Sequence, residues 1–234
     1  MPNEGISKKE LTEKRTPSEL WSWVIQKTDQ IYYCTDEGRR VLRLHKGLVK
    51  QLMEEIRPLA IFGKHKFGDT EQVLMQPVIG NQPYDAVVTD LRTQPPTRGF
   101  IEITQSHEGR NNYLRRCELL GKGYVPPYAP VIKTGTKKNQ AVSIPLEADS
   151  VEGRVENELG RILVAAKKKE SKDYPANTSL IIFFDDAPPF QRVMDNEKLD
   201  SFVSRNILNL DLRFSMLYLV GRDAFREFSL VKKI

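Results

Sequence analysis

Apolar residues recur every three to four positions in the first quarter of the chain, which is the spacing of amphipathic helices. One helix is predicted to begin at Pro17, because Thr16 can cap it and proline favours the first helical position. Its expected apolar face comprises Leu20, Trp21, Val24 and Ile25. A second helix is predicted over roughly 39–57, and Pro58 is expected to end it.

The pattern then changes to short runs that alternate between apolar and polar residues, as in β-strands. A first strand is expected over 73–79. Residues 85–91 and 100–105 are predicted to form a hairpin around a polar, proline-containing loop. Since side chains alternate across a strand, Glu102 and Thr104 are expected to share one face.

The second half of the chain returns to alternating helices and strands. Helices are predicted near 108–121, 150–172 and 196–208, and strands near 179–184, 214–220 and 224–231. The strand at 179–184 is apolar on both faces and should be covered on both sides. The order predicts the α/β (α+β) class, with a mixed central β-sheet flanked by helices.

This pattern also divides the chain into segments. Residues 1–16 are polar and are expected to form a flexible N-terminus. Residues 17–234 are expected to form a single domain, since the chain is 234 residues long and 39% hydrophobic. The proline-rich and basic stretch near 123–149 is predicted to be an irregular insertion.

Composition excludes some classes of site. The net charge of +5 permits an anionic partner without requiring one. Cys34 and Cys117 are the only cysteines, so no zinc motif or disulfide framework is indicated. No glycine-rich nucleotide motif occurs. Neither a secretory signal nor a transmembrane run is indicated, and we expect a cytoplasmic protein.

Two carboxylates stand out on the predicted hairpin. Asp85 and Glu102 each lie in a short apolar run, where an unpaired carboxylate would be costly. A hairpin would bring them together, and such a pair suits a hard divalent cation such as Mg²⁺. The simpler alternatives are a turn position for Asp85 and a solvated strand face for Glu102.

The acid pair and the order of elements resemble the PD-(D/E)XK nuclease-like superfamily. The resemblance implies a restriction-endonuclease-like core, with Asp85 as the first acid and Glu102 as the second. It implies that Asp85, Glu102 and the main-chain carbonyl of Ile103 hold Mg²⁺, or Mn²⁺. Glu55 on the leading helix would add a third acid, with Glu54 as the second choice.

The sequence departs from this family at the motif lysine. Thr104 stands where lysine is expected, and Gln105 would reach the site only through a β-bulge. A cation from another element could replace the lysine, and the candidates are Arg110, Arg115 and Arg116. The basic residues Lys167, Lys168 and Lys169 are interpreted as a solvated helix end that could contact phosphates.

The resemblance implies a Mg²⁺-dependent DNA endonuclease that hydrolyses phosphodiesters. The expected nucleic-acid-binding residues are Arg110, Arg115, Arg116, Lys137 and Lys138. The catalytic set would comprise Asp85, Glu102, Thr104, Gln105 and Glu55. The alternative is a catalytically inactive nuclease-like module that binds nucleic acid or another protein. The oligomeric state is open, a homodimer being one option.

Overall fold

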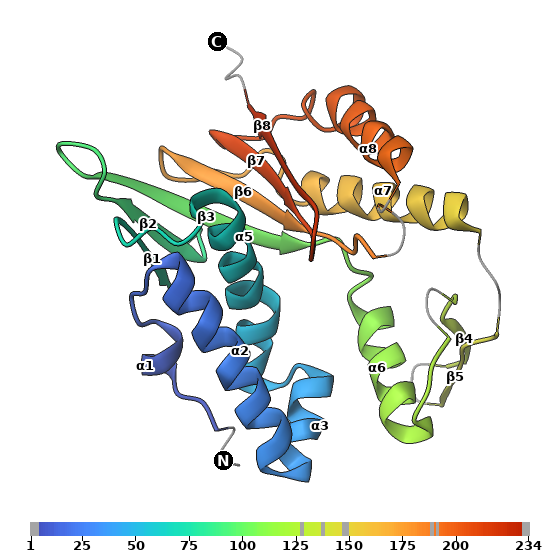
Figure 1. Ribbon diagram of the computed structural model, residues 1–234. Coiled ribbons are helices and arrows are strands. Elements are labelled where there is room, and N and C mark those ends of the chain that lie inside the picture. Colours follow the sequence, from blue (N-terminus) through green and yellow to red (C-terminus); the bar gives the residue numbers. More distant parts are fainter. Residues whose placement is uncertain are drawn as a thin grey trace.

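A six-stranded mixed sheet forms the centre of the molecule in the computed structural model (Figure 1). The structure describes residues 5–126, 129–136, 139–146, 150–187, 190 and 192–230. The strand order is β1-β2-β3-β6-β7-β8. The strands are β1 (Val73–Pro77), β2 (Ala86–Asp90), β3 (Thr97–Gln105), β6 (Thr178–Phe183), β7 (Met216–Val220) and β8 (Phe225–Ser229).

The direction of the strands changes across the sheet. β1, β2 and β3 form an antiparallel meander, and β3, β6 and β7 run parallel. β8 then pairs antiparallel with β7. Parallel neighbours need long crossover connections, and helices supply them here. The predicted class, α+β with a mixed central sheet flanked by helices, is confirmed.

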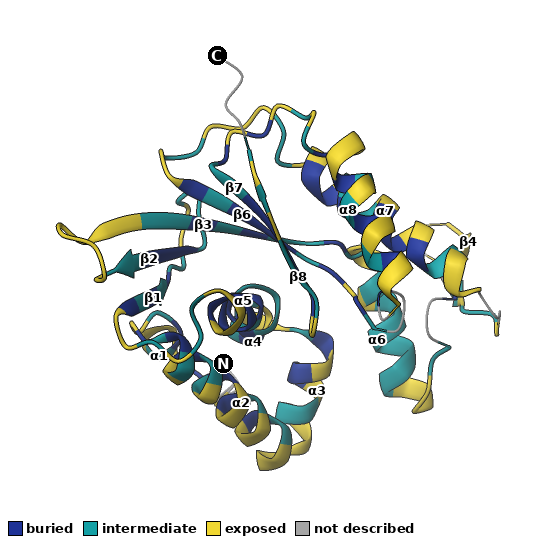
Figure 2. Ribbon diagram, turned by 45° about the horizontal axis from the view of Figure 1, so that its top comes forward, coloured by how far each residue is buried: buried dark blue, intermediate teal, exposed yellow. Residues whose placement is uncertain are grey.

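Helices cover both faces of the sheet. On one face lie α1 (Lys8–Leu11), α2 (Pro17–Cys34), α3 (Asp36–Leu44), α4 (Gly47–Gln51), η1 (Leu52–Ile56) and α5 (Arg57–Phe67). α7 (Val151–Lys167) and α8 (Val193–Asn206) cover the other. Figure 2 shows buried strands between helices whose outer sides are exposed. None of the described helices has the length and apolar character that a membrane crossing requires.

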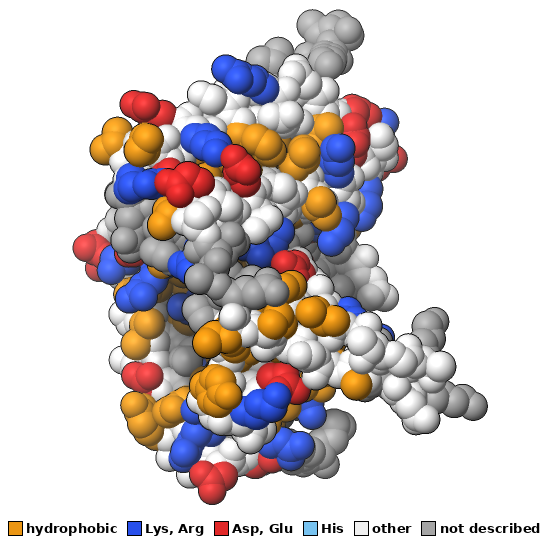
Figure 3. All heavy atoms as spheres, turned by 90° about the vertical axis from the view of Figure 1, so that its right-hand side faces the viewer, with side chains coloured by type: hydrophobic (Ala, Val, Ile, Leu, Met, Phe, Trp, Pro, Cys, Tyr) orange, Lys and Arg blue, Asp and Glu red, His pale blue; other side chains and the backbone are white. Residues whose placement is uncertain are grey.

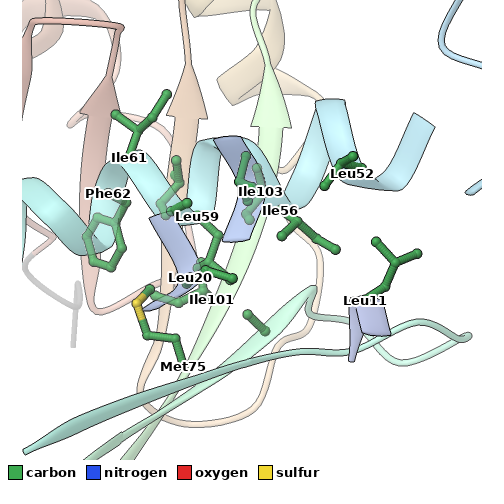
Figure 4. Packing of buried hydrophobic residues seen from close by; sticks show 14 of the residues in the cluster. Leu11, Leu20, Leu52, Ile56, Leu59, Ile61, Phe62, Met75, Ile101 and Ile103 are labelled. Atoms are coloured by element: carbon green, nitrogen blue, oxygen red, sulfur yellow. The ribbon is translucent and has the colours of Figure 1, made fainter. Parts of the chain in front are cut away.

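The first core lies between the sheet and the α2–α5 layer (Figure 4). Leu59 of α5 lies there beside Ile101 and Ile103 of β3, and the ring of Phe62 packs against that of Tyr218, with centroids 4.8 Å apart. α5 approaches β1 closely at Gly63, where a Cβ atom would lie 2.5 Å from the sulfur of Met75.

The second core lies on the α7–α8 face. Ile181 of β6 belongs to the first core, whereas its neighbours Leu180 and Ile182 belong to the second. β6 is therefore covered on both faces, as its apolar sequence predicts. Leu159 and Ile162 of α7 pack against it.

The N-terminus differs from the flexible segment expected over 1–16. Ser7 caps α1 in a capping box, and Leu11 is fully buried. The backbone of Arg15 exchanges two hydrogen bonds with Met75, of 2.8 and 3.0 Å. Burial of Leu11 and backbone pairing with β1 hold this stretch in place. Its polar composition therefore wrongly indicates a flexible segment.

The helix predicted at Pro17 is confirmed as α2, with Thr16 as its cap. One residue of its expected apolar face is wrong, since Ile25 is 42% exposed. The helix predicted over 39–57 is also wrong in its limits. It breaks at His45, which has a left-handed backbone, and continues past Pro58 to Phe67.

Pro58 is accommodated because a π-helical turn precedes it. The N–H of Arg57 donates to the carbonyl of Leu52, five residues back. In a regular α-helix the residue at position 58 would donate to the Glu54 carbonyl, and proline has no N–H to do so. The side-chain amide of Gln105 donates to that carbonyl instead, at 2.8 Å.

α6 (Arg110–Lys122) ends at Gly123, which adopts a left-handed conformation. The insertion expected to be irregular contains a two-stranded hairpin, β4 (Ile132–Gly135) with β5 (Gln140–Ser143). In Figure 1 this hairpin and α6 lie beyond the edge of the sheet at which β3 ends. On the face in Figure 3, Lys and Arg side chains are interspersed with Asp and Glu.

Candidate functional site

The two predicted acids come together where β2 begins and β3 continues past it. The N–H of Asp85 donates to the carbonyl of Ile101 at 2.7 Å, which extends the ladder by one residue. The Asp85 carboxylate in turn accepts the N–H of Ile103 at 2.7 Å. Since the N–H and C=O of a strand residue point to the same side, the Ile103 carbonyl also faces Asp85.

Burial and mutual repulsion perturb this acid pair. Burial raises the pKa of Asp85 from 3.8 to about 7, and the charge of Glu102 adds to the effect. The side chain of Glu102 is only 13% exposed. Glu102 therefore differs from its simpler alternative of a solvated strand face. Asp85 does lie in a bend just before β2, as its turn alternative has it, but its side chain is partly buried.

Lys169 supplies the cation at this site. Its ammonium group hydrogen-bonds the Glu102 carboxylate, and its side chain is only 16% exposed. The N–H of Lys169 donates to the Ala166 carbonyl in the turn that follows α7. The interpretation of Lys169 as part of a solvated helix end is wrong.

A topological signal could have indicated Lys169. α7 lies in the connection between the parallel strands β3 and β6, and Glu102 is paired in register with Leu180. A crossover helix runs back along the sheet, so its last turn lies near the start of the next strand. Lys169 is therefore brought to the part of the sheet that holds Glu102.

Glu55 lies close enough to this pair to interact with both of its acids. Burial raises its pKa, the charges of Glu54 and Glu102 add to the shift, and the charges of Lys50 and Lys169 oppose it. Asp85 is also affected by the charge of Glu55. The choice of Glu55 over Glu54 thus agrees with the placement of the two side chains.

Glu54 belongs to a separate cluster. Its carboxylate lies 3.0 Å from His45, 3.5 Å from Arg116 and 3.9 Å from His107. Burial would raise the pKa of Glu54, but hydrogen bonds from the two histidines outweigh it and hold that pKa well below its ordinary value.

Thr104 lies as strand alternation predicts, and no β-bulge brings Gln105 round to the site. The ladder between β3 and β6 is regular through Gln105, which pairs with Phe183. Gln105 therefore points to the face opposite Glu102 and bonds the Glu54 carbonyl. Thr104 shares the face of Glu102 by strand alternation.

The three arginines proposed as replacement cations are engaged elsewhere. Arg116 contacts Glu54, and Arg115 lies 3.2 Å from Glu108 and donates to the Ala129 carbonyl at 2.9 Å. Arg110 opens α6 and lines a cavity beside the Glu54 cluster. Lys137 and Lys138 lie outside the described residues.

Tyr174 is a neighbour of the acid pair that sequence reasoning missed. Burial raises the pKa of its hydroxyl to about 12, and the charges of Glu102 and Asp85 contribute to this shift. Its ring packs against Phe214, with centroids 4.2 Å apart.

The oxygen atoms of the site suit a divalent cation. The carboxylates of Asp85, Glu102 and Glu55 interact with one another and with the ammonium group of Lys169, and Glu55 also interacts with that of Lys50. Within the described parts of the chain, no three His, Cys, Asp or Glu side chains converge closely enough to hold a metal by themselves. The Ile103 carbonyl, on the Asp85 side, is the additional oxygen that the donor set offers.

No protein-family model, curated protein or solved structure matches this chain. The resemblance to the PD-(D/E)XK superfamily therefore stays a prediction. It depends on this chain alone: the acid pair, Glu55 and the order of helices and strands.

Proposed function

We propose that this protein is a metal-dependent endonuclease that hydrolyses phosphodiester bonds in DNA. The observation that supports it best is the buried pair of Asp85 and Glu102, with Lys169 bonded to the second acid. A carboxyl pKa near 7 in a partly buried site is a mark of functional residues. Mixed acids and a lysine suit phosphoryl chemistry, in which charge must be neutralised.

The acids and one backbone carbonyl would hold the cation. Asp85 and Glu102 provide carboxylate oxygens, and Ile103 provides its main-chain carbonyl. Mg²⁺ bound there supplies positive charge for the scissile phosphate and lowers the pKa of a water molecule. Glu55 lies near enough to interact with both acids and could accept a proton from that water.

Lys169 takes the place of the motif lysine, which this chain lacks because Thr104 stands at that position. Its bond to Glu102 fixes the ammonium group on the face of β3 that Thr104 shares. From there it can stabilise the negative charge that develops on the phosphate. Thr104 can hydrogen-bond water and provides no charge.

Plasmid cleavage tests this proposal. We expect the wild type to nick supercoiled DNA with Mg²⁺ or Mn²⁺ and to be inactive with EDTA. Asp85→Asn and Glu102→Gln should each lower the rate by roughly 100-fold or more, since each removes a carboxylate from the site. Asp69→Asn is a control, because Asp69 bonds Ser18 at an exposed position.

Circular dichroism establishes that each variant is folded. Cleavage that is equal in the wild type and both site variants, or that persists in EDTA, would contradict the proposal. An RNA substrate of the same sequence, assayed in parallel, shows whether the preference for DNA is correct.

The alternative, an inactive module that binds nucleic acid, is favoured by the Glu102–Lys169 ion pair itself. An acid that is already neutralised by lysine is a weaker metal ligand. In that case the wild type would bind DNA without cleaving it, and Mg²⁺ would leave its melting temperature unchanged at pH 8.

A further inference from the structure

A second cavity, of about 490 Å³, opens at the carboxyl ends of the parallel strands. Ser106 follows β3, Asp185 follows β6 and Arg222 follows β7, and all three line it. Arg57, the first residue of α5, lines it from the helical layer. In open α/β sheets, ligands bind at this edge.

Four arginines line this cavity, and two of them are neutralised by the protein. Arg161 bonds Glu158, and Arg115 lies 3.2 Å from Glu108. In the described part of the chain, neither Arg57 nor Arg222 has a carboxylate within ion-pair distance of its guanidinium group. The carboxylates of Asp185 and Asp186 line the cavity as well. Arg57 and Arg222 are thus the two arginines of its described lining that have no ion-pair partner, and an external anion could bind them.

These two arginines lie close enough to repel each other. Burial lowers the pKa of Arg57, and the charge of Arg222 lowers it further. Bringing two uncompensated guanidinium groups together is unfavourable unless an anion binds between them.

The loop that carries Arg222 is held rigidly. The Asp186 carboxylate accepts the N–H groups of Arg222, Asp223 and Ala224 at 2.9, 2.7 and 2.7 Å. Gly221 allows this close approach, since a Cβ atom there would lie 2.4 Å from the Asp186 side chain. Because the amides satisfy Asp186, its charge is engaged with the backbone rather than with Arg222.

A neighbouring cavity adjoins this one beside α7. It is lined by Gln105, His107 and Arg161, which also line the 490 Å³ cavity, so the two cavities adjoin. Lys168, the residue before Lys169, and Glu108 also line it.

We propose that the cavity between Arg57 and Arg222 binds a phosphate group of the polynucleotide whose cleavage is proposed above. Guanidinium groups match phosphate oxygens with paired hydrogen bonds, which makes arginine well suited to this role. This inference rests on the proposed function for the source of the phosphate. A free phosphate monoester has the same chemistry, and the experiment separates the two sources.

The test measures binding of a labelled DNA duplex and a labelled single strand in EDTA, so that no cleavage occurs. Arg57→Gln and Arg222→Gln should each weaken binding several-fold. Each should also reduce the slope of log K against log salt by roughly 0.7–0.9, as expected for one lost phosphate contact. The matched control is Arg205→Gln, at an exposed position on α8, which should leave both quantities unchanged.

Inorganic phosphate and thymidine 5′-monophosphate are titrated against the same proteins by thermal shift. A stabilisation that disappears in Arg57→Gln, without any DNA binding, assigns the cavity to a free phosphate monoester. If neither DNA nor these small anions distinguishes the two variants from the wild type and control, the cavity proposal is overturned.

Failure of one proposal is distinguishable from failure of the other. A wild type that binds DNA through Arg57 but cleaves nothing contradicts the proposed nuclease and leaves the phosphate site intact. If the protein cleaves DNA but its affinity for DNA is the same in both arginine variants as in the wild type, only the phosphate site is contradicted.

Discussion

At the scale of single residues, the ionisation of Asp85 links the candidate site to stability. Its carboxyl has an ordinary pKa of 3.8, which burial and Glu102 raise to about 7 in the folded protein. Between these values the unfolded chain loses the proton and the folded chain retains it. The free energy of unfolding of the metal-free protein should therefore fall as the pH rises from about 4 to 7, and then level off.

Asp85→Asn should remove this dependence, because asparagine stays neutral and can still accept the Ile103 N–H. In EDTA at pH 8 we expect the variant to be more stable than the wild type, by on the order of 2 kcal/mol. At pH 4.5 the two proteins should be nearly equal. Urea unfolding at both pH values measures the difference between the two free energies of unfolding. A difference that does not change with pH would contradict the raised pKa of Asp85.

At the scale of elements, the π-helical turn before Pro58 determines how the helical layer meets the sheet. Glu54 and Glu55 both lie in this turn, one in the histidine cluster and one near the acid pair. The Gln105 bond to the Glu54 carbonyl ties the turn to the last residue of β3. A π-turn at such a junction is a frequent feature of functional sites.

Gln105→Leu should cost roughly 1–2 kcal/mol, since it removes the donor to a partly buried carbonyl. Pro58→Ala restores a backbone N–H at this turn, so the double variant should lose less stability than the sum of the single variants. Urea unfolding of the four proteins gives the coupling energy. Gln26→Leu, on the exposed side of α2, is the control. Strict additivity within about 0.5 kcal/mol would contradict this explanation.

Local patterns predicted the elements well and their long-range contacts poorly. Thr16 and Pro17 define the start of α2, and alternation placed Glu102 on β3, because both signals lie within a few residues. The role of Lys169 depends on a crossover between strands that are distant in sequence. Pro58 does not end the helix as its local sequence predicts, because the donor that compensates for its missing N–H is Gln105, which lies on another element.

At the scale of the whole molecule, the candidate site joins two parts of the chain. The acids come from the helical layer and the meander, and Lys169 comes from the turn after α7. The insertion lies between them in the sequence. The length of the insertion can therefore change without altering the acids or Lys169, provided that α7 still packs on the sheet.

Lys169→Met should lower cleavage by roughly 100-fold or more while DNA binding persists, since it removes the charge that stabilises the transition state. Adding Thr104→Lys to this variant should restore part of the rate, because position 104 shares the face of Glu102. Lys167→Met, at the exposed last residue of α7, is the matched control. An equal loss in the control, or full activity in Lys169→Met, would rule out this role.

The Glu102–Lys169 pair also imposes an order in time. Lys169 follows Glu102 by 67 residues, so a chain under synthesis contains both acids before it contains their lysine. At ordinary rates of translation this interval lasts roughly 3–13 s. A growing chain would hold the acids of the proposed site without the cation, and would acquire the complete set only after α7 has been made and has docked.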